Sequence, residues 1–188
     1  LATGGFSTSD TSMGGFMDNG ADLVCIFFMM SAAIPFGVYL LIVARGDWIA
    51  PLRDSQVRAF IVLIMTLIAL VTLYLWLNSE FTRSRALRLS AFNVISIVTG
   101  TGFATADYST WGPFAVSVFF AFMFIGGCAG STACSIKIFR YQVAFEGLRS
   151  YLFKMPRQHS VTPLRYGGKI LPEAVLFSVM GYFFLFFV

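Results

Sequence analysis

One short pattern, Gly-Phe-x-Thr-x-Asp, occurs twice in the sequence at an offset of 97 residues, at positions 5–10 and 102–107. Glycine adopts left-handed conformations at little cost, so a loop that contains it can turn successive carbonyl oxygens toward one axis. A ring of such oxygens can replace the water shell of a cation. A single copy would favour a simple turn in which Thr or Asp caps the next helix. Two copies favour a repeated cation-binding loop.

The segment before the second loop supports this interpretation. Residues 87–98 are mostly apolar but too few to cross a bilayer, and apolar stretches of 10–14 residues are typical of buried or re-entrant helices. Such a half-helix would point its partly negative C-terminal end at the loop 99–107, which favours a cation. Four acidic residues are expected at the outer mouth, where they would concentrate cations: Asp10, Asp18, Asp22 and Asp107.

The composition places these elements in a membrane. The chain has 188 residues, of which 57% are hydrophobic and only 12% charged, and its mean hydropathy is +0.79. Soluble domains carry about 25% charged residues. Uncharged runs predict spans at residues 23–44, 59–79, 108–136 and 174–188, the last of them cut by the end of the chain.

The basic residues predict the orientation. The net charge of +4 reflects positive-inside topology rather than nucleic-acid binding. Segment 137–173 holds seven Lys and Arg residues against two Glu, which places it in the cytoplasm and the repeated loops outside. Arg83, Arg85 and Arg88 conflict with this orientation, because they fall on the outer side.

A run of ten small residues, 126–135, interrupts the third apolar stretch. Each glycine inside a helix costs about 1 kcal/mol relative to alanine, so a break or loop is one interpretation. Close helix packing is the other, because Gly126 and Gly130 form a GxxxG pair. The residues alone do not separate the two. Lys137 and Arg140 follow directly and are expected to snorkel to the inner interface, and the preceding apolar run has only a kink at Pro35.

Other chemistries find little support. The three cysteines form no CxxC pair, and His159 is the only histidine, which argues against a disulfide framework and a zinc site. The glycine run lacks the lysine of a phosphate-binding loop. The acidic residues stand at helix ends, where an intramembrane protease would not place its catalytic pair. The sequence therefore predicts no enzyme, and a non-specific monovalent cation channel is the main alternative to a selective transporter.

Four segments resemble the Trk/Ktr/HKT family of potassium transporters and are closest to its TrkH branch: 3–8, 99–105, 126–132 and 163–168. The resemblance implies an all-α integral membrane fold, with repeated units of helix, pore helix, filter loop and helix around a central pore. It implies filter residues Thr3, Gly4, Gly5, Gly100, Thr101 and Gly102, with K⁺ held at Thr3, Gly4, Gly100 and Thr101. It also implies an intramembrane gate that includes Gly126, Gly127, Gly130, Ser131 and Thr132.

The resemblance also implies an organisation and a function. Residues 1–56 would hold one filter loop and its second helix, and 57–145 the complete next repeat, with a broken helix at 108–145. Residues 146–172 would form a cytoplasmic basic loop and 173–188 the truncated first helix of a further repeat. The family moves K⁺ across the bacterial inner membrane without an organic cofactor in this subunit. Its expected partners are a second copy of the chain, membrane lipid and a TrkA-like cytosolic nucleotide-binding subunit, and no nucleic acid.

Overall fold

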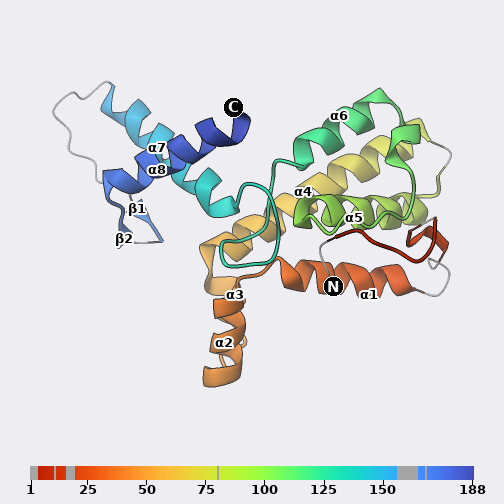
Figure 1. The fold of residues 1–188 in the computed structure, drawn as a ribbon, viewed down its shortest axis with the longest axis horizontal. Helices are drawn as coiled ribbons and strands as arrows, with labels where there is room; N and C mark the ends of the chain where they lie inside the picture. The colour runs from red at the N-terminus through yellow and green to blue at the C-terminus, as the bar shows by residue number, and fades with distance from the viewer. Residues whose placement is uncertain (1–3, 11, 16–19, 80, 156–164, 168) are drawn as a thin grey trace. The chain divides into compact units, whose positions relative to one another are not determined.

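The computed structural model describes the chain except residues 1–3, 11, 16–19, 80, 156–164 and 168. The chain divides into two compact units, Leu1–Lys137 and Ile138–Val188. The described secondary structure is helical apart from one small hairpin in the second unit (Figure 1). Each unit is described by itself below.

The first unit begins with a broken span. Helix α1 (Ala21–Ala32) and helix α2 (Phe36–Arg45) meet at an angle of 91° around Pro35. Proline lacks the amide hydrogen that a continuous helix needs, and it forces the preceding residue out of the helical region. The single kinked span predicted for residues 23–44 is therefore two separate helices.

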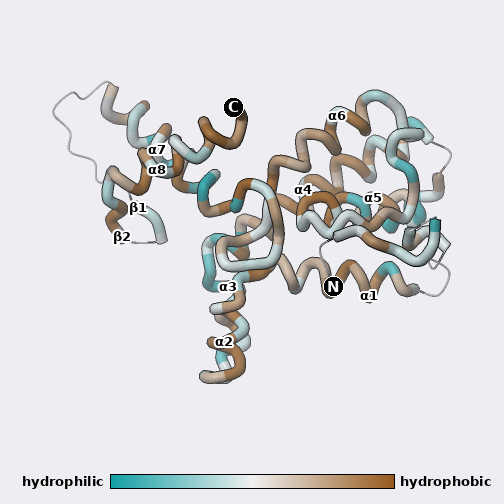
Figure 2. Tube along the Cα trace, viewed as in Figure 1, coloured by the Kyte–Doolittle hydropathy of each residue, from teal (hydrophilic) through white to brown (hydrophobic). Residues whose placement is uncertain are grey.

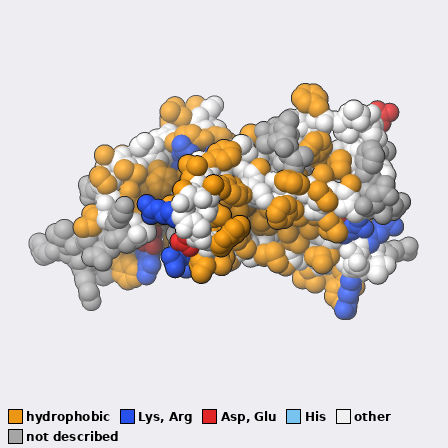
Figure 3. Space-filling model, turned by 90° about the horizontal axis from the view of Figure 1, so that it is seen from below, with side chains coloured by type: hydrophobic (Ala, Val, Ile, Leu, Met, Phe, Trp, Pro, Cys, Tyr) orange, Lys and Arg blue, Asp and Glu red, His pale blue; other side chains and the backbone are white. Residues whose placement is uncertain are grey.

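Helix α3 (Ala50–Arg53) leads into α4 (Ser55–Asn78), which Asp54 caps by accepting hydrogen bonds from the amides of Gln56 and Val57. In the part of the chain that the structure describes, α4 is the helix that is long and apolar enough to cross a membrane alone, and the α1–α2 pair is a second span if it counts as one. Helices α1, α4 and α6 (Pro113–Phe122) consist largely of hydrophobic residues (Figure 2). Apolar side chains cover much of the face that Figure 3 shows. Such exposed apolar surface suits contact with lipid.

Helix α5 (Arg83–Thr99) is the predicted half-helix, and it packs against α1 and α4. It begins four residues before the predicted start at 87, because the exposed Arg83 and Arg85 extend a helix without joining its apolar pattern. It ends at Gly100, which adopts a left-handed conformation with φ +70°. The chain therefore leaves the helix in a tight turn at the position where the predicted loop begins.

The third apolar run is much less helical than predicted. Residues Tyr108–Trp111 form a 3₁₀ helix, followed by α6, and residues 123–137 are irregular. A short parallel bridge joins Ile125 to Ile136 across the irregular segment. The glycine-rich stretch is therefore a loop and not a closely packed helix.

The second unit contains α7 (Ile138–Lys154), α8 (Glu173–Phe187) and an antiparallel hairpin of β1 (Arg165–Tyr166) and β2 (Lys169–Ile170). Part of the segment predicted as a basic loop is thus helical, since α7 extends to Lys154. Helices α7 and α8 pack closely at Gly147. A β-carbon at this position would lie only 2.5 Å from the Leu176 side chain. The guanidinium of Arg140, predicted to snorkel, lies 3.8 Å from the ring centre of Tyr182.

Candidate ion-binding loops and gate

The two copies of the repeated motif meet in space. A β-carbon added to Gly5 would lie 2.9 Å from the carbonyl oxygen of Gly102, and one added to Gly102 would lie 3.2 Å from the Cα of Gly5. Both glycines have positive φ, +66° and +80°. A side chain at either position would strain the backbone and collide with the other loop. Only glycine therefore allows the two loops to approach this closely.

Hydrogen bonds outside the glycines join the same two loops. The amide of Met13 donates to the carbonyl of Ala104 at 2.9 Å, and the amide of Ala104 donates to the Ser12 hydroxyl at 3.2 Å. Ser12 has φ +53°, an uncommon value for a non-glycine residue. The loops are thus held together at more than the point where their glycines touch.

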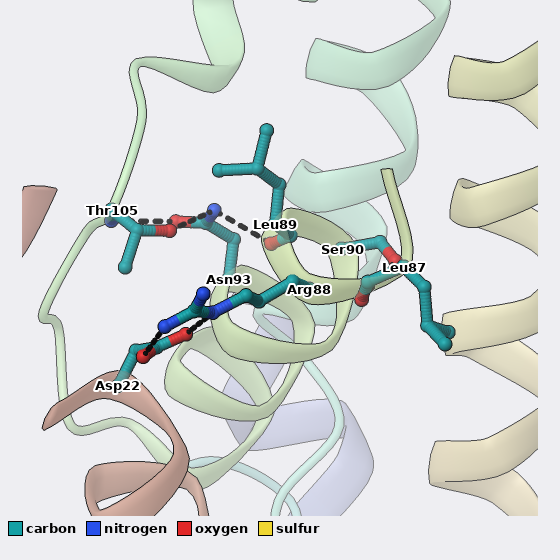
Figure 4. Close-up of polar contacts among 7 residues, drawn as sticks. All are labelled: Asp22, Leu87, Arg88, Leu89, Ser90, Asn93 and Thr105. Carbon is teal, nitrogen blue, oxygen red and sulfur yellow. Dashed lines mark hydrogen bonds and ion pairs between the residues drawn. The ribbon is translucent and has the colours of Figure 1, made fainter. Parts of the chain in front are cut away.

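The second loop is also fixed to its own helix. The hydroxyl of Ser96 donates to the carbonyl of Phe103 at 2.5 Å, and the carbonyl of Ser96 accepts from the amide of Thr101 at 2.9 Å. The side chain of Asn93 donates to the Thr105 hydroxyl at 3.0 Å and accepts from the Thr105 amide at 3.3 Å (Figure 4). Sequence reasoning missed Asn93 and Ser96, although their three-residue spacing in an apolar helix was a visible signal.

Backbone oxygens remain available where the loop turns. Among the described residues, no hydrogen bond is accepted by the carbonyl oxygen of Gly100, Thr101 or Gly102. Gly4 of the first loop is exposed, and Thr3 lies outside the described residues. Free carbonyl oxygens on a glycine-bearing loop are the donor set that a monovalent cation needs.

A cavity of about 730 Å³ lies beside the paired loops. Asp10 and Asp107, two of the four acidic residues expected at the outer mouth, both line it. The hydroxyl and amide of Ser109 hold the pKa of the Asp107 carboxyl below its usual range, so this group is charged at neutral pH. Asp18 lies outside the described residues.

Asp22, the fourth predicted mouth residue, has a different role. Its side chain is completely buried and accepts two hydrogen bonds from the Arg88 guanidinium, which joins α1 to α5 (Figure 4). A buried carboxylate needs such a partner, because leaving it unpaired is costly. The prediction that Asp22 attracts cations at the mouth is therefore wrong. Asp22 thus neutralises the charge of Arg88, one of the three arginines that conflicted with the predicted orientation. The guanidinium of Arg83, another of the three, lies 4.1 Å from the ring centre of Trp76.

The glycine-rich loop 126–135 contacts the break between α1 and α2. The amides of Cys128 and Thr132 donate to the carbonyls of Ala33 and Ala32 at 3.1 and 3.3 Å, and the Phe36 amide donates to the carbonyl of Gly130 at 3.0 Å. These bonds satisfy backbone groups that a helix end leaves without partners. A further bond of 2.9 Å runs from the amide of Ala129 to the side chain of Gln56. Sequence reasoning did not foresee that one helix break would bind the other.

The same loop also contacts the candidate ion-binding loop. A β-carbon on Gly100 would lie 2.9 Å from the Cβ of Cys134. Within the loop, a β-carbon on Gly126 would lie 2.1 Å from the carbonyl oxygen of Cys134. At the α1–α2 break, a β-carbon on Gly127 would lie 3.0 Å from the carbonyl oxygen of Ala33. Gly130 has φ +76°. Each of the three glycines predicted in the gate thus has a conformation or a contact that disfavours a side chain.

Lys137, predicted to snorkel to the inner interface, has its ammonium bonded to its own loop. Its ammonium donates hydrogen bonds to the carbonyls of Ser131 and Ala133, and the residue is half-buried. The loop folds back over the lysine that follows it, so that its own carbonyl oxygens solvate the charge. The lysine is therefore part of the loop structure.

Known proteins are similar to this chain over nearly its whole length. The family described as "TrkH: Cation transport protein" matches residues 1–188. The Trk system potassium uptake protein TrkI of Halomonas elongata is 39% identical over all of this chain and 38% of its own length, and TrkH of Escherichia coli K12 is 29% identical over 97% and 38%. The crystal structure of the potassium transporter TrkH from Vibrio parahaemolyticus superposes with a TM-score of 0.89 at 31% identity, covering 97% of this chain and 40% of that one.

These relatives confirm the predicted helical membrane fold and exclude the enzyme alternative. The chain spans about two fifths of the length of the relatives it matches. From the motif, the fold and the matched length together, the chain belongs to the TrkH family of cation transport proteins, which are membrane proteins.

Proposed function

We propose that this chain forms part of a potassium uptake protein of the bacterial inner membrane, in which K⁺ passes between glycine-bearing filter loops. Residues Thr3, Gly4 and Gly5 form one loop, and Gly100, Thr101 and Gly102 form the next. Their carbonyl oxygens, above all those of Thr3, Gly4, Gly100 and Thr101, take the place of water around the ion. K⁺ is the transported ion and not a resident cofactor.

One observation carries this proposal, the contact between Gly5 and Gly102. Two repeats place the same glycine, with the same sign of φ, against each other. Side chains are excluded there, so the neighbouring backbone oxygens can share one axis. The names of the relatives, which are potassium uptake proteins, supply the ion.

In this proposal, the other filter loops of the pore lie outside the 188 residues of this chain. Because the relatives are more than twice as long, we assign the other filter loops to further repeats of the same polypeptide. Residues 1–56 and 57–145 then correspond to part of one repeat and all of the next, and 173–188 to the start of another. A second copy of the protein and a TrkA-like nucleotide-binding subunit complete the assembly, the latter at the basic segment 137–173.

Loop 126–135 is the gate in this proposal. It contacts Gly100 from one side and the α1–α2 break from the other, and it lacks the internal hydrogen bonds of a helix. Movement of this loop would change the passage beside the filter while the helices around it stay in place.

The test is growth at low potassium of a bacterium that lacks its own potassium uptake systems, with the full-length protein supplied. The wild type restores growth, and Gly102→Ala does not, because the β-carbon strains the backbone by about 1–2 kcal/mol and presses on Gly5. Gly46→Ala is the matched control, since Gly46 also has positive φ, +65°, but has no atom within 4 Å of an added β-carbon. Equal growth of the Gly102→Ala and wild-type strains at equal membrane content would falsify the proposal.

A further inference from the structure

Most of the buried polar side chains in the described part of the chain belong to one array. Seven polar or charged residues are buried there, and two of them, Asp22 on α1 and Ser90 near the start of α5, are not part of the array. The other five lie on α5 and on the loop that follows it: Asn93, Ser96, Thr99, Thr101 and Thr105. Burying so many polar groups in a membrane protein is costly unless each one is hydrogen-bonded.

The array has a regular geometry. Asn93, Ser96 and Thr99 stand three residues apart and therefore share one face of α5. They bond in reverse order to alternate residues of the extended loop, because Thr99 pairs with Thr101, Ser96 with the carbonyl of Phe103, and Asn93 with Thr105. The oxygen–oxygen distance in the first pair is 2.6 Å and in the second 2.5 Å. We call these three pairs the zipper.

The direction of the bonds in the zipper is determined. Thr99 donates its one hydroxyl proton to the carbonyl of Ile95 at 2.7 Å, so the Thr101 hydroxyl must be the donor between the two threonines. Asn93 uses both amide protons, on Leu89 and Thr105, and its oxygen accepts from the Thr105 amide. The Thr101 hydroxyl is thus turned toward the helix.

The other face of the same loop meets the neighbouring repeat. Residues 102 and 104 alternate with the zipper residues, and these are the ones that contact Gly5, Ser12 and Met13. The loop is thus held between its own helix on one side and the next loop on the other. Losing any one of the three pairs in the zipper would alter how far the carbonyls of Gly100 and Thr101 extend toward the ion.

We propose that Asn93, Ser96 and Thr99 are the positioning residues that set ion discrimination, because the zipper fixes the distance of the loop carbonyls from the permeating ion. The inference rests on the proposed function, since it concerns the same filter. These residues do not touch the ion themselves. They act through the loop, as supporting groups do wherever ligand oxygens must be held in a fixed place.

The experiment measures uptake of radioactive rubidium, a stand-in for K⁺, by the full-length protein in liposomes with increasing external Na⁺. Ser96→Ala and Thr99→Val each remove one hydroxyl from the zipper. We expect each to lower the Na⁺ concentration that halves uptake by about fivefold, the factor that corresponds to one ordinary hydrogen bond. Thr99→Ser keeps the hydroxyl and restores the wild-type value.

The matched controls lie on the same helix and on its neighbour. Ser90 is also a completely buried serine of α5, but it bonds to Thr72 of α4 and to the carbonyl of Leu87, away from the loop. Ser90→Ala and Thr72→Val should leave Na⁺ inhibition unchanged. If Ser96→Ala and Thr99→Val match these controls in Na⁺ inhibition, the zipper does not set discrimination. A wild-type protein that takes up no rubidium at all would instead contradict the proposed function.

Discussion

At the scale of single residues, charge inside the first unit is compensated by specific partners. Asp22 is buried against the guanidinium of Arg88, and the ammonium of Lys137 lies on two backbone carbonyls. The energetic reason is the same in both cases, because a low dielectric environment penalises an uncompensated charge. The two charges nevertheless act on different elements, one on α5 and the other on loop 126–135.

The Arg88–Asp22 pair holds the pore helix α5 to α1. Arg88→Gln leaves a buried carboxylate without its partner, which should lower the stability by at most about 3–5 kcal/mol. Thermal unfolding of the full-length protein in detergent measures this loss. Arg85→Gln is the control on the same helix, since Arg85 is exposed and its guanidinium lies 5.5 Å from the ring of Phe81.

Removing both charges tests whether the loss of stability comes from the unpaired carboxylate or from the loss of the arginine side chain itself. The double variant Asp22→Asn with Arg88→Gln should recover part of the lost stability, because no unpaired charge remains buried. A double variant as unstable as Arg88→Gln alone would show that the ion pair is not what the single substitution disrupts.

At the scale of elements, two interrupted helices satisfy each other. The α1 helix ends at a proline break and leaves carbonyls of Ala32 and Ala33 without helical partners, while loop 126–135 carries amides that no helix uses. Neither segment could lie at membrane depth alone, since irregular backbone there must be enclosed by protein or water. The hydrogen bonds between them explain how an irregular, glycine-rich loop is ordered among apolar helices.

If loop 126–135 is the gate that we propose, the hydrogen bonds of Lys137 to it hold the gate in the observed position. Lys137→Gln removes charge-assisted hydrogen bonds worth about 1.5–3 kcal/mol each, so the loop should leave the passage more often. We expect potassium uptake without the regulatory partner to rise about tenfold, because losing about 1.4 kcal/mol, close to the lower value for one such bond, changes an equilibrium tenfold. Rubidium flux into liposomes that contain only the full-length protein measures it.

Two further variants test the cause of this effect. Lys137→Arg keeps the positive charge and should stay near the wild-type rate. Arg45→Gln removes an exposed basic residue in the last turn of α2 and should leave the flux unchanged. Equal flux for Lys137→Gln and the wild type would rule out a stabilising role of this lysine in the gate.

At the scale of the whole molecule, this chain contributes two of the loops that the proposed filter needs. In the second loop, the carbonyl of Phe103 accepts a hydrogen bond from the Ser96 hydroxyl, whereas the carbonyl oxygens of residues 100–102 accept none among the described residues. A potassium channel loop of the sequence Thr-Val-Gly-Tyr-Gly turns a longer run of carbonyls toward its axis. Fewer ordered sites should mean weaker discrimination.

We therefore expect the full-length protein to admit Na⁺ in competition with K⁺ to a measurable degree. Rubidium uptake in the presence of Na⁺, compared with a potassium channel in the same liposomes, is the direct assay. The channel should show almost no inhibition at Na⁺ concentrations that reduce uptake by this protein. Exclusion of Na⁺ as strict as that of the channel would contradict the expectation.

Local features of this protein were determined by the sequence itself. The repeated Gly-Phe-x-Thr-x-Asp motif and the half-helix before its second copy depend on residues close together in the chain, whereas the residues alone left open whether 126–135 is a break or a closely packed helix. Propensity and hydropathy act over such short distances, so their consequences can be predicted without coordinates. The boundary of α5 was missed because exposed arginines continue a helix that the apolar pattern does not mark.

Contacts between distant residues were decided only by the tertiary structure. The sequence placed Asp22 at the mouth and Lys137 at an interface, but their partners lie in other elements or on backbone carbonyls. Nothing in the spacing of Pro35 and Gly130 shows that their two breaks bind each other, or that Gly5 touches Gly102. Burial makes each of these partners obligatory, yet which partner is within reach depends on how the helices pack.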